Sequence, residues 1–472
     1  MTLTPDQVRA RWAGLRAHDL PTHGGRTLAY VYDSGRPEVD AVAREAMAEF
    51  AATNGLDPTA FGSLAVMEHE VVSFVADLLD APAGFAGSVT SGGTESCLLA
   101  VLAARDARPD LIRPQIIAPT TVHAAFHKAA HLFGLDLHLV DVDPVTFRAD
   151  PPAMVAALTE RTVLVVVSAP SYAHGVVDPV APIAGEAAAR GIRCHVDACI
   201  GGFVLPFLDG PAASAPEWSF AVPGVTSISA DLHKYGYAPK GASVLVHRSN
   251  ALRHSQFWAT ADWPGYGVVN STLQSTKSGG PLAAAWSTVQ LLGRDGYAAL
   301  ATAARQAALT VAREAAHIPG VRLLAPPDST LVALAADGSC DVYTVCDELL
   351  ARGWFAQPQL PFDGGEASLH LSLSAATASV LPEFLEALRD AVRAGIAAGP
   401  VRLDPALVQL LGSLDPASLD EQAVTGLLAA AGLSGGEDGI RLPSRMAQVN
   451  ALLAACPVPL REALLVAVVE RL

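Results

Sequence analysis

The 472-residue chain is predicted to be an α/β protein with a large, mainly parallel sheet domain and a smaller C-terminal α/β domain. The prediction depends on short, nearly continuous β-branched runs, such as V-L-V-V-V-S at 163–168, and on the helical segments between them. A strand that is apolar on both faces is typical of a parallel sheet covered by helices on either side. Strands and helices are therefore expected to alternate over residues 55–290.

The composition is that of a folded globular chain, because 51% of the residues are hydrophobic and 17% are charged. A formal net charge of −16 argues against nucleic acid or an anionic membrane surface as the main partner. No run reaches the roughly 18 apolar residues of a membrane span, and the N-terminus has no apolar signal core. The six cysteines lack C-x-x-C spacing, which favours packing thiols over a metal site. We expect a soluble cytoplasmic protein without stable membrane insertion.

The order of elements predicts four segments. Residues 1–54 form an arm, with helices over Pro5–Leu15 and about Pro37–Ala52, that is expected to lie across a neighbouring subunit. Residues 55–290 form the large domain, 291–399 the small domain, and 400–472 a tail of three or four helices. The loop G-L-S-G-G-E-D-G at 432–439 is the predicted flexible point of the tail.

Individual elements follow from hydrophobic spacing. The expected strands of the large domain are Gln115–Ala118, Leu135–Val140, Val163–Ser168, Arg193–Val196, Thr226–Ala230 and Ser243–His247. Its expected helices are Ser63–Leu79, Val122–Leu132, Pro152–Leu158 and Pro179–Ala189. After a helix-rich stretch at Leu282–His317, the small domain should contain strands in V-R-L-L-A, L-V-A-L-A and L-H-L-S-L-S, and helices at Val342–Arg352 and Pro382–Ala398.

The turn after the expected strand at 226–230 contains the first candidate for covalent chemistry. It reads D-L-H-K-Y-G-Y-A-P-K-G over 231–241, and its two glycines and Pro239 disfavour a continuing helix. Lys234 therefore lies in a rigid turn beside His233, where its amine can form a Schiff base with an aldehyde once its pKa is lowered. The alternative is a solvated loop lysine, so the interpretation depends on the residues around it.

Three further features support a cofactor site at Lys234. The segment S-G-G-T-E-S at 91–96 lies where a loop becomes a helix N-terminus, an arrangement that binds phosphate. Asp197 ends a predicted strand, where a carboxylate can pair with a ring cation, and His123 begins a helix, where it can stack on a planar ligand. Each has an ordinary alternative: a loop glycine pair, a capping or salt-bridged aspartate, and a surface histidine.

A phosphate cradle, a partner for a ring cation, a stacking ring and a Schiff-base lysine together indicate a pyridoxal phosphate site. Their order along the chain is that of fold-type I enzymes. The segments T-S-G-G-T-E-S, H-A-A-F-H-K-A, H-V-D-A-C-I-G-G-F and D-L-H-K-Y-G-Y-A-P-K-G resemble those of sphingosine-1-phosphate lyase and its bacterial relatives. More broadly, residues 28–395 resemble the group II pyridoxal-phosphate decarboxylases, whereas the tail after Gly399 matches no feature of that family.

The resemblance implies a fold-type I pyridoxal-phosphate transferase fold and a homodimer with active sites at its interface. Its candidate catalytic residues are Lys234, Tyr32, Lys240 and His123. By position, Lys234 would bind the cofactor covalently, Asp197 would face the pyridine nitrogen, and His123 and Ala198 would lie on opposite faces of the ring. The cofactor phosphate would contact Gly93, Thr94 and His233, with Gly279 and Gly280 from a second subunit. The positions expected to face a small-molecule amine substrate are Asn54, Asp57, Tyr32 and Lys240.

Two departures from the family pattern bear on the substrate. N-P-L-H-P becomes N-G-L-D-P, so Asp57 replaces a histidine that could bind a substrate phosphate, and a carboxylate repels phosphate. R-P-G-G becomes K-S-G-G, so Lys277 replaces an arginine and a bidentate grip is lost. Both weaken the case for a phosphorylated substrate and make Asp57 a candidate partner for Lys240.

The predicted activity is that of a carbon–carbon lyase, which cleaves an amino alcohol or amino acid in a retro-aldol step to an aldehyde and an amine. The alternative is an amino acid decarboxylase that releases CO2. Transamination is disfavoured because the strand L-H-L-S-L-S has His370 where transaminases place a carboxylate-binding arginine. Intact Lys234, Asp197 and His123 disfavour a non-catalytic interaction protein.

Overall fold

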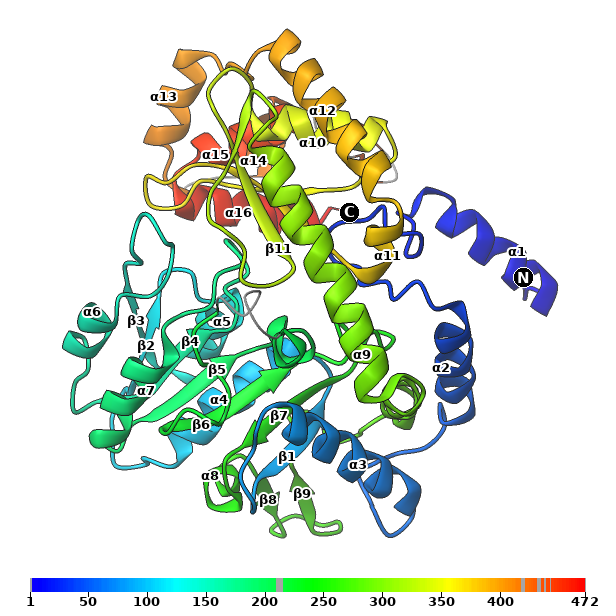
Figure 1. The fold of residues 1–472 in the computed structure, drawn as a ribbon, viewed down its shortest axis with the longest axis vertical. Coiled ribbons are helices and arrows are strands. Elements are labelled where there is room, and N and C mark those ends of the chain that lie inside the picture. The colour runs from blue at the N-terminus through cyan, green and yellow to red at the C-terminus, as the bar shows by residue number, and fades with distance from the viewer. Residues whose placement is uncertain are drawn as a thin grey trace.

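The computed structural model describes residues 2–208, 215–416, 421–430, 434–436, 439–441 and 443–471. A seven-stranded sheet fills the lower half of the molecule, a four-stranded sheet lies in the upper half, and the long helix α9 (Gly279–Ala315) runs between them (Figure 1). The mainly parallel large sheet and the smaller C-terminal α/β unit confirm the predicted fold class.

The large sheet has the strand order β1-β7-β6-β5-β4-β2-β3. Its strands are β1 (Ala86–Thr90), β2 (Gln115–Pro119), β3 (Asp136–Val140), β4 (Thr162–Ser168), β5 (Arg193–Asp197), β6 (Val225–Ala230) and β7 (Ser243–His247). The pairs from β3 to β6 are parallel, whereas β7 runs antiparallel to both β6 and β1. The carboxyl ends of β2, β4, β5 and β6 therefore meet at one edge, which is where ligands bind in such sheets.

Helices cover both faces of this sheet, as the doubly apolar strands predict. One layer contains α4 (Gly93–Asp106), α5 (Ala124–Phe133) and α8 (Asn250–His254); the other contains α3 (Gly62–Leu78), α6 (Pro151–Ala156), α7 (Val180–Ala189) and part of α9. Along β4, Leu164 and Val166 join the core under α4 and α5, while Val165 and Val167 join the opposite core. The two-residue period of a strand explains this alternation.

The N-terminal arm packs largely on its own chain. Helix α1 (Pro5–Leu15) has no buried residue and projects from the body (Figure 1), and the short 3-10 helix η1 (Arg16–His18) follows it. Leu28 is fully buried and its N–H donates to the Phe355 carbonyl at 2.8 Å. Helix α2 (Pro37–Glu49) packs against α9. Helix α1 is therefore the part of the arm that is left to contact a neighbouring subunit, as the sequence predicts for the arm.

The small unit is a four-stranded antiparallel sheet backed by helices. Its strands in order are β10 (Val321–Leu323), β11 (Leu331–Ala336), β13 (Ser368–Ser372) and β12 (Gln357–Gln359). The helices are α10 (Val342–Ala351), α11 (Ala375–Ser379) and α12 (Leu381–Ala398), with the C-terminal half of α9 in the same core. The expected boundary at residue 290 lies inside α9, three residues before a break in helical geometry at Gly293.

The tail contains α13 (Pro405–Ser413), α14 (Glu421–Ala430), α15 (Ala447–Ala455) and α16 (Val458–Val469), and it has an apolar core of its own. The buried Asp347 carboxylate of α10 accepts the N–H groups of Met446 and Ala447 at 2.8 and 2.9 Å, which attaches the start of α15 to the small unit. Part of the loop expected at 432–439 is instead a strand: β14 (Ser434–Gly436) pairs with β15 (Gly439–Arg441), whereas 432–433 and 437–438 lie outside the described residues.

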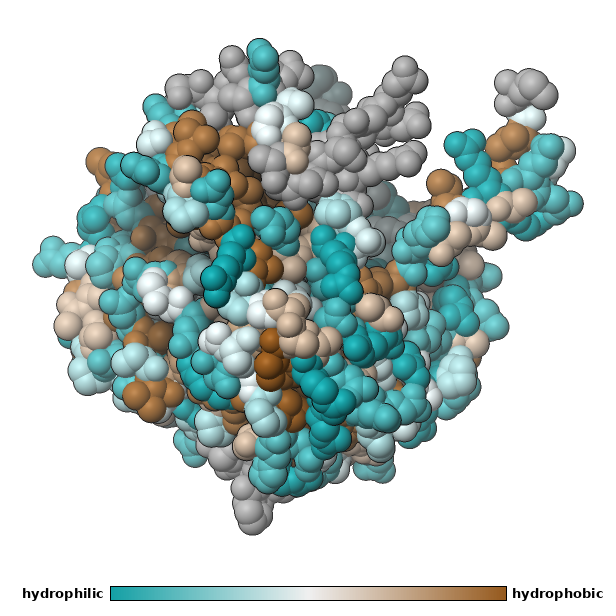
Figure 2. All heavy atoms as spheres, turned by 90° about the horizontal axis from the view of Figure 1, so that it is seen from above, coloured by the Kyte–Doolittle hydropathy of each residue, from teal (hydrophilic) through white to brown (hydrophobic). Residues whose placement is uncertain are grey.

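Some elements were not predicted from the sequence. The hairpin of β8 (Trp258–Thr260) and β9 (Val268–Asn270) has mostly half-exposed side chains without clear alternation, and η2 (Gly201–Phe203) and η3 (Leu205–Phe207) are single turns. All six cysteines are buried and free. No helix in the described part of the chain is long and apolar enough to cross a bilayer. Seen from the small-unit side, the surface mixes hydrophilic side chains with separate apolar patches (Figure 2).

Candidate active site

Lys234 lies in the loop that joins the antiparallel strands β6 and β7. The loop folds back on itself, because the His233 N–H donates to the Ala242 carbonyl at 3.0 Å and the Ala238 N–H donates to the Leu232 carbonyl at 2.9 Å. Gly241 has φ +109°, a conformation that favours glycine. The rigid turn expected around Lys234 is therefore present at the carboxyl end of β6.

The lysine amine pairs with a carboxylate that was not predicted from the sequence. Lys234 Nζ lies 2.9 Å from Asp231 Oδ2, and the Asp231 side chain is 1% exposed. Burial alone would lower the pKa of Lys234, but the Asp231 charge, with smaller contributions from Cys199, Tyr32 and Asp197, holds this pKa well above its usual value. In the cofactor-free chain Lys234 is therefore protonated, and its ammonium group must lose a proton before it can attack an aldehyde.

The glycines at 92 and 93 are closely packed at the start of α4. A Cβ on Gly93 would lie 2.6 Å from Asp231 Oδ2 and 2.8 Å from Cys199 Sγ, and a Cβ on Gly92 would lie 3.0 Å from the His233 ring. Only glycine fits at position 93, and Thr94 follows it exposed in the first turn. The N–H groups of this turn and the adjacent imidazole suit a phosphate group.

Asp197 and His123 lie at the same edge of the sheet: Asp197 is the last residue of β5, and His123 follows β2. Asp197 is 8% exposed, and its Oδ1 accepts the Cys199 N–H at 3.1 Å. Ala198 is fully buried. His123 is exposed and caps α5, its Nδ1 accepting the Ala125 N–H at 3.2 Å. His123 is therefore a helix cap, as one of the two interpretations expected, and its side chain is exposed at the sheet edge.

Among the described residues, Asp197 also belongs to one of two groups of side chains that could hold a metal ion. Its carboxylate lies within 4.8 Å of the Cys97 and Cys199 thiols, which are buried. Hydrogen bonding to Cys97 and burial raise the pKa of the Cys199 thiol well above its usual value, so it is neutral. Neutral thiols are poor metal ligands, which agrees with a packing role.

Tyr32 and Lys240 come together beside Lys234. Lys240 Nζ lies 5.0 Å from the centre of the Tyr32 ring and donates to the carbonyls of Tyr30 at 2.8 Å and His233 at 3.2 Å. Its side chain is partly exposed, yet desolvation of the ammonium and the Lys234 charge lower the pKa of Lys240 to about 8. Burial raises the pKa of Tyr32, and the Lys234 charge opposes that rise.

Tyr172 and Ser372 also reach this site, and neither was predicted from the sequence. The half-buried Tyr172 follows β4, and its phenol interacts electrostatically with Tyr32 and Lys234. Ser372 ends β13 and lies near enough to Tyr32 to oppose the rise in the pKa of its phenol. His370 is fully buried beneath Tyr172. The two segments are about 200 residues apart, so no local motif connects them; the polar alternation of L-H-L-S-L-S is the only sequence signal.

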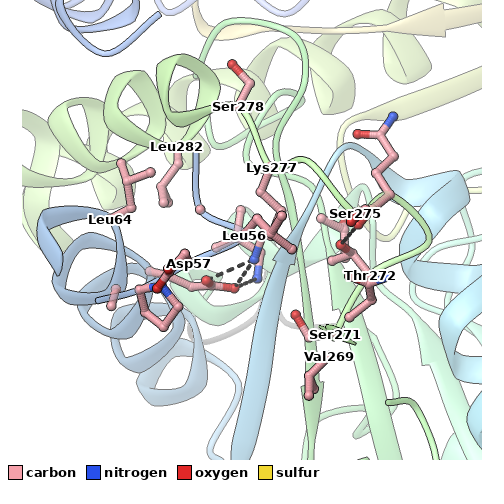
Figure 3. Close-up of a pocket in the computed structure, with 18 of the residues that line it drawn as sticks. Leu56, Asp57, Leu64, Val269, Ser271, Thr272, Ser275, Lys277, Ser278 and Leu282 are labelled. Atoms are coloured by element: carbon pink, nitrogen blue, oxygen red, sulfur yellow. Dashed lines mark hydrogen bonds and ion pairs between the residues drawn. The ribbon is translucent and has the colours of Figure 1, made fainter. Parts of the chain in front are cut away.

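Of the remaining predicted residues, Asp57 lines an adjoining cavity of about 810 Å³ (Figure 3). Asp57 and Lys277 line it, and Thr90, Ser91 and Gly241 connect its wall to the loops around Lys234. Asn54 stands next to it, where its Oδ1 accepts the N–H groups of Leu56 at 3.0 Å and Lys277 at 3.2 Å. Figure 3 shows Leu56, Asp57 and Leu64 on one side of Lys277 and Ser271, Thr272 and Val269 on the other.

The expected contact between Asp57 and Lys240 does not form within one chain. The exposed Asp57 carboxylate accepts the N–H and hydroxyl of Thr59 at 2.8 and 2.6 Å, which closes its own turn. Elsewhere on the cavity wall, Lys277 Nζ pairs with the Glu68 carboxylate at 2.8 Å. Gly279 and Gly280 are buried against the end of α2, where Cβ atoms would meet Thr53 and Met47. Their predicted role at the cofactor phosphate therefore requires a second subunit.

Most of the lysines in the chain lie around the β6–β7 loop and the adjoining cavity. The sequence has four lysines in 472 residues, at positions 128, 234, 240 and 277. Two of them lie beside one another in the β6–β7 loop and a third lines the adjacent cavity. A chain that uses arginine almost everywhere else keeps lysine where a compact ammonium group or a reactive amine is useful.

Two family models match the chain. One is the "Pyridoxal-dependent decarboxylase conserved domain", over residues 28–334. The chain belongs to the pyridoxal-dependent decarboxylase family. The second model, "Pyridoxal-dependent enzyme, C-terminal putative HTH domain", matches residues 405–471. The expectation that the tail matches no family feature was therefore wrong: helices α13–α16 are a recognised appendage of pyridoxal-dependent enzymes.

Individual relatives within the family are lyases by name. The chain is 36% identical over 361 residues to sphingosine-1-phosphate lyase of Dictyostelium discoideum, covering 76% of this chain and 67% of that one. It is 35% identical over 397 residues to sphingosine-1-phosphate lyase 1 of Rattus norvegicus, covering 83% and 68%. The solved sphingosine-1-phosphate lyase of Burkholderia pseudomallei matches with a TM-score of 0.78 and 33% identity, over 84% of this chain and 92% of that one. These relatives confirm the predicted resemblance.

A glutamate decarboxylase of Lactobacillus brevis shares the fold, with a TM-score of 0.75 at 21% identity. Pyridoxal phosphate is the cofactor of the family, and the site fits it: the glycine turn has no room for a side chain, a half-buried lysine lies beside it, and Asp197 lies at the same edge. The protein is thus a pyridoxal-phosphate-dependent lyase, as predicted.

Proposed function

We propose that the protein cleaves the bond between the amine-bearing carbon and the hydroxyl-bearing carbon of a β-hydroxy amine, giving an aldehyde and an amine. The observation that carries the proposal is the pair of Lys234 with the buried Asp231, 2.9 Å apart, at the sheet edge that also holds Asp197 and the glycine turn. Likeness to named sphingosine-1-phosphate lyases at about 35% identity favours this reaction over loss of CO2.

Each site residue has a proposed task. Lys234 holds the cofactor aldehyde, Asp197 faces the ring nitrogen, and His123 and Ala198 lie on opposite faces of the ring. Gly93, Thr94 and His233 hold the phosphate. When bound, the cofactor supplies an electron sink for the broken bond. Tyr32 and Lys240 are placed to hold the substrate hydroxyl and to contact a substrate anion.

A homodimer completes this site in the proposal. Gly279 and Gly280 of one subunit would contact the phosphate bound by the other, and Asn54 and Asp57 would face the other subunit's substrate. Exposed apolar side chains around the cavity support an interface there, since Trp258, Tyr266 and Val269 are 57%, 61% and 62% exposed in the single chain. The cytoplasmic location expected from the sequence is retained as part of the proposal.

The substrate class is tested with a panel of amino acids and β-hydroxy amines, each with and without a phosphate group. Production of aldehyde without CO2 is the expected result, and CO2 release from an amino acid would contradict the proposal. The Asp57→His variant then addresses the phosphate. Because histidine removes a repulsive carboxylate, activity that rises only on phosphorylated amines would indicate a natural substrate without phosphate.

The pH dependence follows from Lys240. Burial and the Lys234 charge lower the pKa of Lys240 to about 8 in the cofactor-free chain. The Lys234 charge is lost when that amine holds the cofactor, so kcat/KM for an anionic substrate is expected to fall about tenfold per pH unit above a pH of about 8 or higher. In Lys240→Arg the charge persists, and the falling limb should move to higher pH. A limb at pH 8 that remains in Lys240→Arg, or a rate that rises through pH 8, would contradict this assignment.

A further inference from the structure

A buried carboxylate joins two segments that border the cavity. The first segment is the end of β1 with the glycine turn, residues 89–93, and the second is the loop 271–278 between β9 and α9. Glu95, in the first turn of α4, accepts the Ser91 N–H through Oε2 at 2.6 Å and the Leu273 N–H through Oε1 at 2.9 Å. One side chain therefore holds the turn with one oxygen and the loop with the other.

A second glutamate, on α3, joins the same two segments. Glu68 Oε1 accepts the Val89 N–H at 2.9 Å, and Lys277 Nζ donates to Glu68 Oε1 at 2.8 Å and to Oε2 at 2.9 Å. The side chains of Lys277 and Glu68 are 19% and 25% exposed, so water and salt screen this ion pair less than a surface pair. Residues 89–91 and 273–277 are thus connected at two points, each time through a carboxylate.

The carboxylate of Glu95 has no neutral equivalent of the same shape. Both of its partners are N–H donors, and a carboxylate offers an acceptor oxygen to each of them. A glutamine would accept from one N–H and direct its own NH2 group at the other. Glu95 is 7% exposed, so water would hardly hydrate the N–H that loses its acceptor. Glutamine should therefore release either the turn or the loop while keeping the size of the side chain.

The loop is in turn fixed to the end of the N-terminal arm. The Lys277 N–H donates to Asn54 Oδ1 at 3.2 Å, and the Lys277 carbonyl accepts the Gly55 N–H at 2.7 Å. The Gly279 N–H donates to the Thr53 carbonyl at 3.2 Å. These contacts make one unit of the loop, the turn that follows the arm and the start of α9. The same parts carry the residues that the proposed homodimer presents to the other subunit's site.

We propose that Glu95 and Glu68 are positioning residues that couple the two cofactor sites of the homodimer. A phosphate bound at the glycine turn of one subunit orders that turn. The two glutamates transmit this order to the loop 271–278 of the same subunit, which belongs to the unit that faces the second site. Binding of the first cofactor thereby favours binding of the second. This inference rests on the homodimer of the proposed function and not on the reaction proposed there.

The coupling is tested by titrating cofactor-free protein, shown by sedimentation to be a dimer, with pyridoxal phosphate and recording the absorbance of the bound cofactor. The wild-type curve should be sigmoidal, with a Hill coefficient of about 1.5, below the limit set by two sites. Glu95→Gln should make the curve hyperbolic and raise the half-saturating concentration about tenfold, the effect of one lost hydrogen bond. Lys277→Met, which breaks the second link from the loop side, should also lower the Hill coefficient. Glu186→Gln, at an exposed position of α7, is the matched control and should change neither value.

Hydrogen exchange separates this coupling from a merely structural role. In wild-type protein the cofactor should slow exchange in peptides from both 86–93 and 271–277. In Glu95→Gln it should still slow exchange in 86–93, whereas 271–277 should lose most of its response. A glutamate that only stabilised the fold would leave the response to cofactor intact in both peptides.

A hyperbolic curve in a wild-type dimer overturns the proposal, as does an equal exchange response of the loop in wild type and Glu95→Gln. A dimer that cleaves β-hydroxy amines but binds cofactor without cooperativity would leave the proposed reaction standing and refute the coupling. Cooperative binding without cleavage of any β-hydroxy amine would do the reverse. A protein that sediments as a monomer when loaded with cofactor would refute both the homodimer and the coupling.

Discussion

Replacing Lys234 by alanine is expected to abolish turnover, a decrease of at least about 10⁴-fold, because the amine that we propose holds the cofactor is removed. The variant should also lose the visible absorbance of covalently held cofactor, and borohydride should fix no cofactor to the chain. The substitution removes the cation closest to a carboxylate that is 1% exposed, so Asp231 is left buried with only the His233 imidazole, 3.6 Å from its Oδ2, beside it. A lower melting temperature of the cofactor-free variant is therefore expected as well.

The matched control is Lys128→Ala, which removes an exposed lysine from α5. It should retain absorbance and turnover. Because the chain has only four lysines, digestion and mass spectrometry of borohydride-treated protein can assign the modified residue directly. Cofactor fixed at Lys240 or Lys277 in otherwise untouched wild-type protein would show that Lys234 is wrongly assigned.

Residues at strand ends were predictable, because the apolar run that identifies a strand also shows which residue stands at its carboxyl end. Asp197 follows a buried run and Lys234 follows another, and parallel neighbours deliver both to one edge of the sheet. The direction of β7 was not predictable in this way. Its run S-V-L-V-H is as apolar as a parallel strand, but a loop of about a dozen residues returns it antiparallel to β6.

Asp231 is a site residue that was not identified from the sequence, although it lies in a recognised motif. It belongs to the same D-L-H-K segment as Lys234, and spacing alone suggests nothing about it because the segment is not helical. The turn nevertheless brings the two side chains to 2.9 Å, and burial makes the pair matter electrostatically. A pair of this kind depends on the path of the backbone, which residue types do not reveal.

Tyr172, His370 and Ser372 were beyond local inference for a different reason. Their contacts form only when β13 packs beside the segment after β4, which is a tertiary event between distant parts of the chain. The prediction for Asp57 met the same limit. Its carboxylate is taken by Thr59 within its own turn, so its expected relation to Lys240 now depends on a second subunit.

Replacing Asp197 by asparagine is expected to decrease kcat by about 10² to 10⁴-fold, because breaking a buried charge pair costs about 3–5 kcal/mol. The change is nearly isosteric, and the asparagine carbonyl can still accept the Cys199 N–H that Asp197 Oδ1 accepts at 3.1 Å. The fold should therefore persist, and the loss should report the missing charge opposite the ring nitrogen. Steady-state kinetics and a thermal melt of the same preparation measure the two effects separately.

Charge and shape at this position can be distinguished further. Asp197→Glu keeps the carboxylate but displaces it, so it should retain more activity than Asp197→Asn if charge dominates. A cofactor methylated on its ring nitrogen carries a permanent positive charge and should restore part of the activity of Asp197→Asn, since it no longer depends on the carboxylate to stay charged. Activity of Asp197→Asn within about threefold of wild type would mean that Asp197 packs against Cys199 without serving the cofactor.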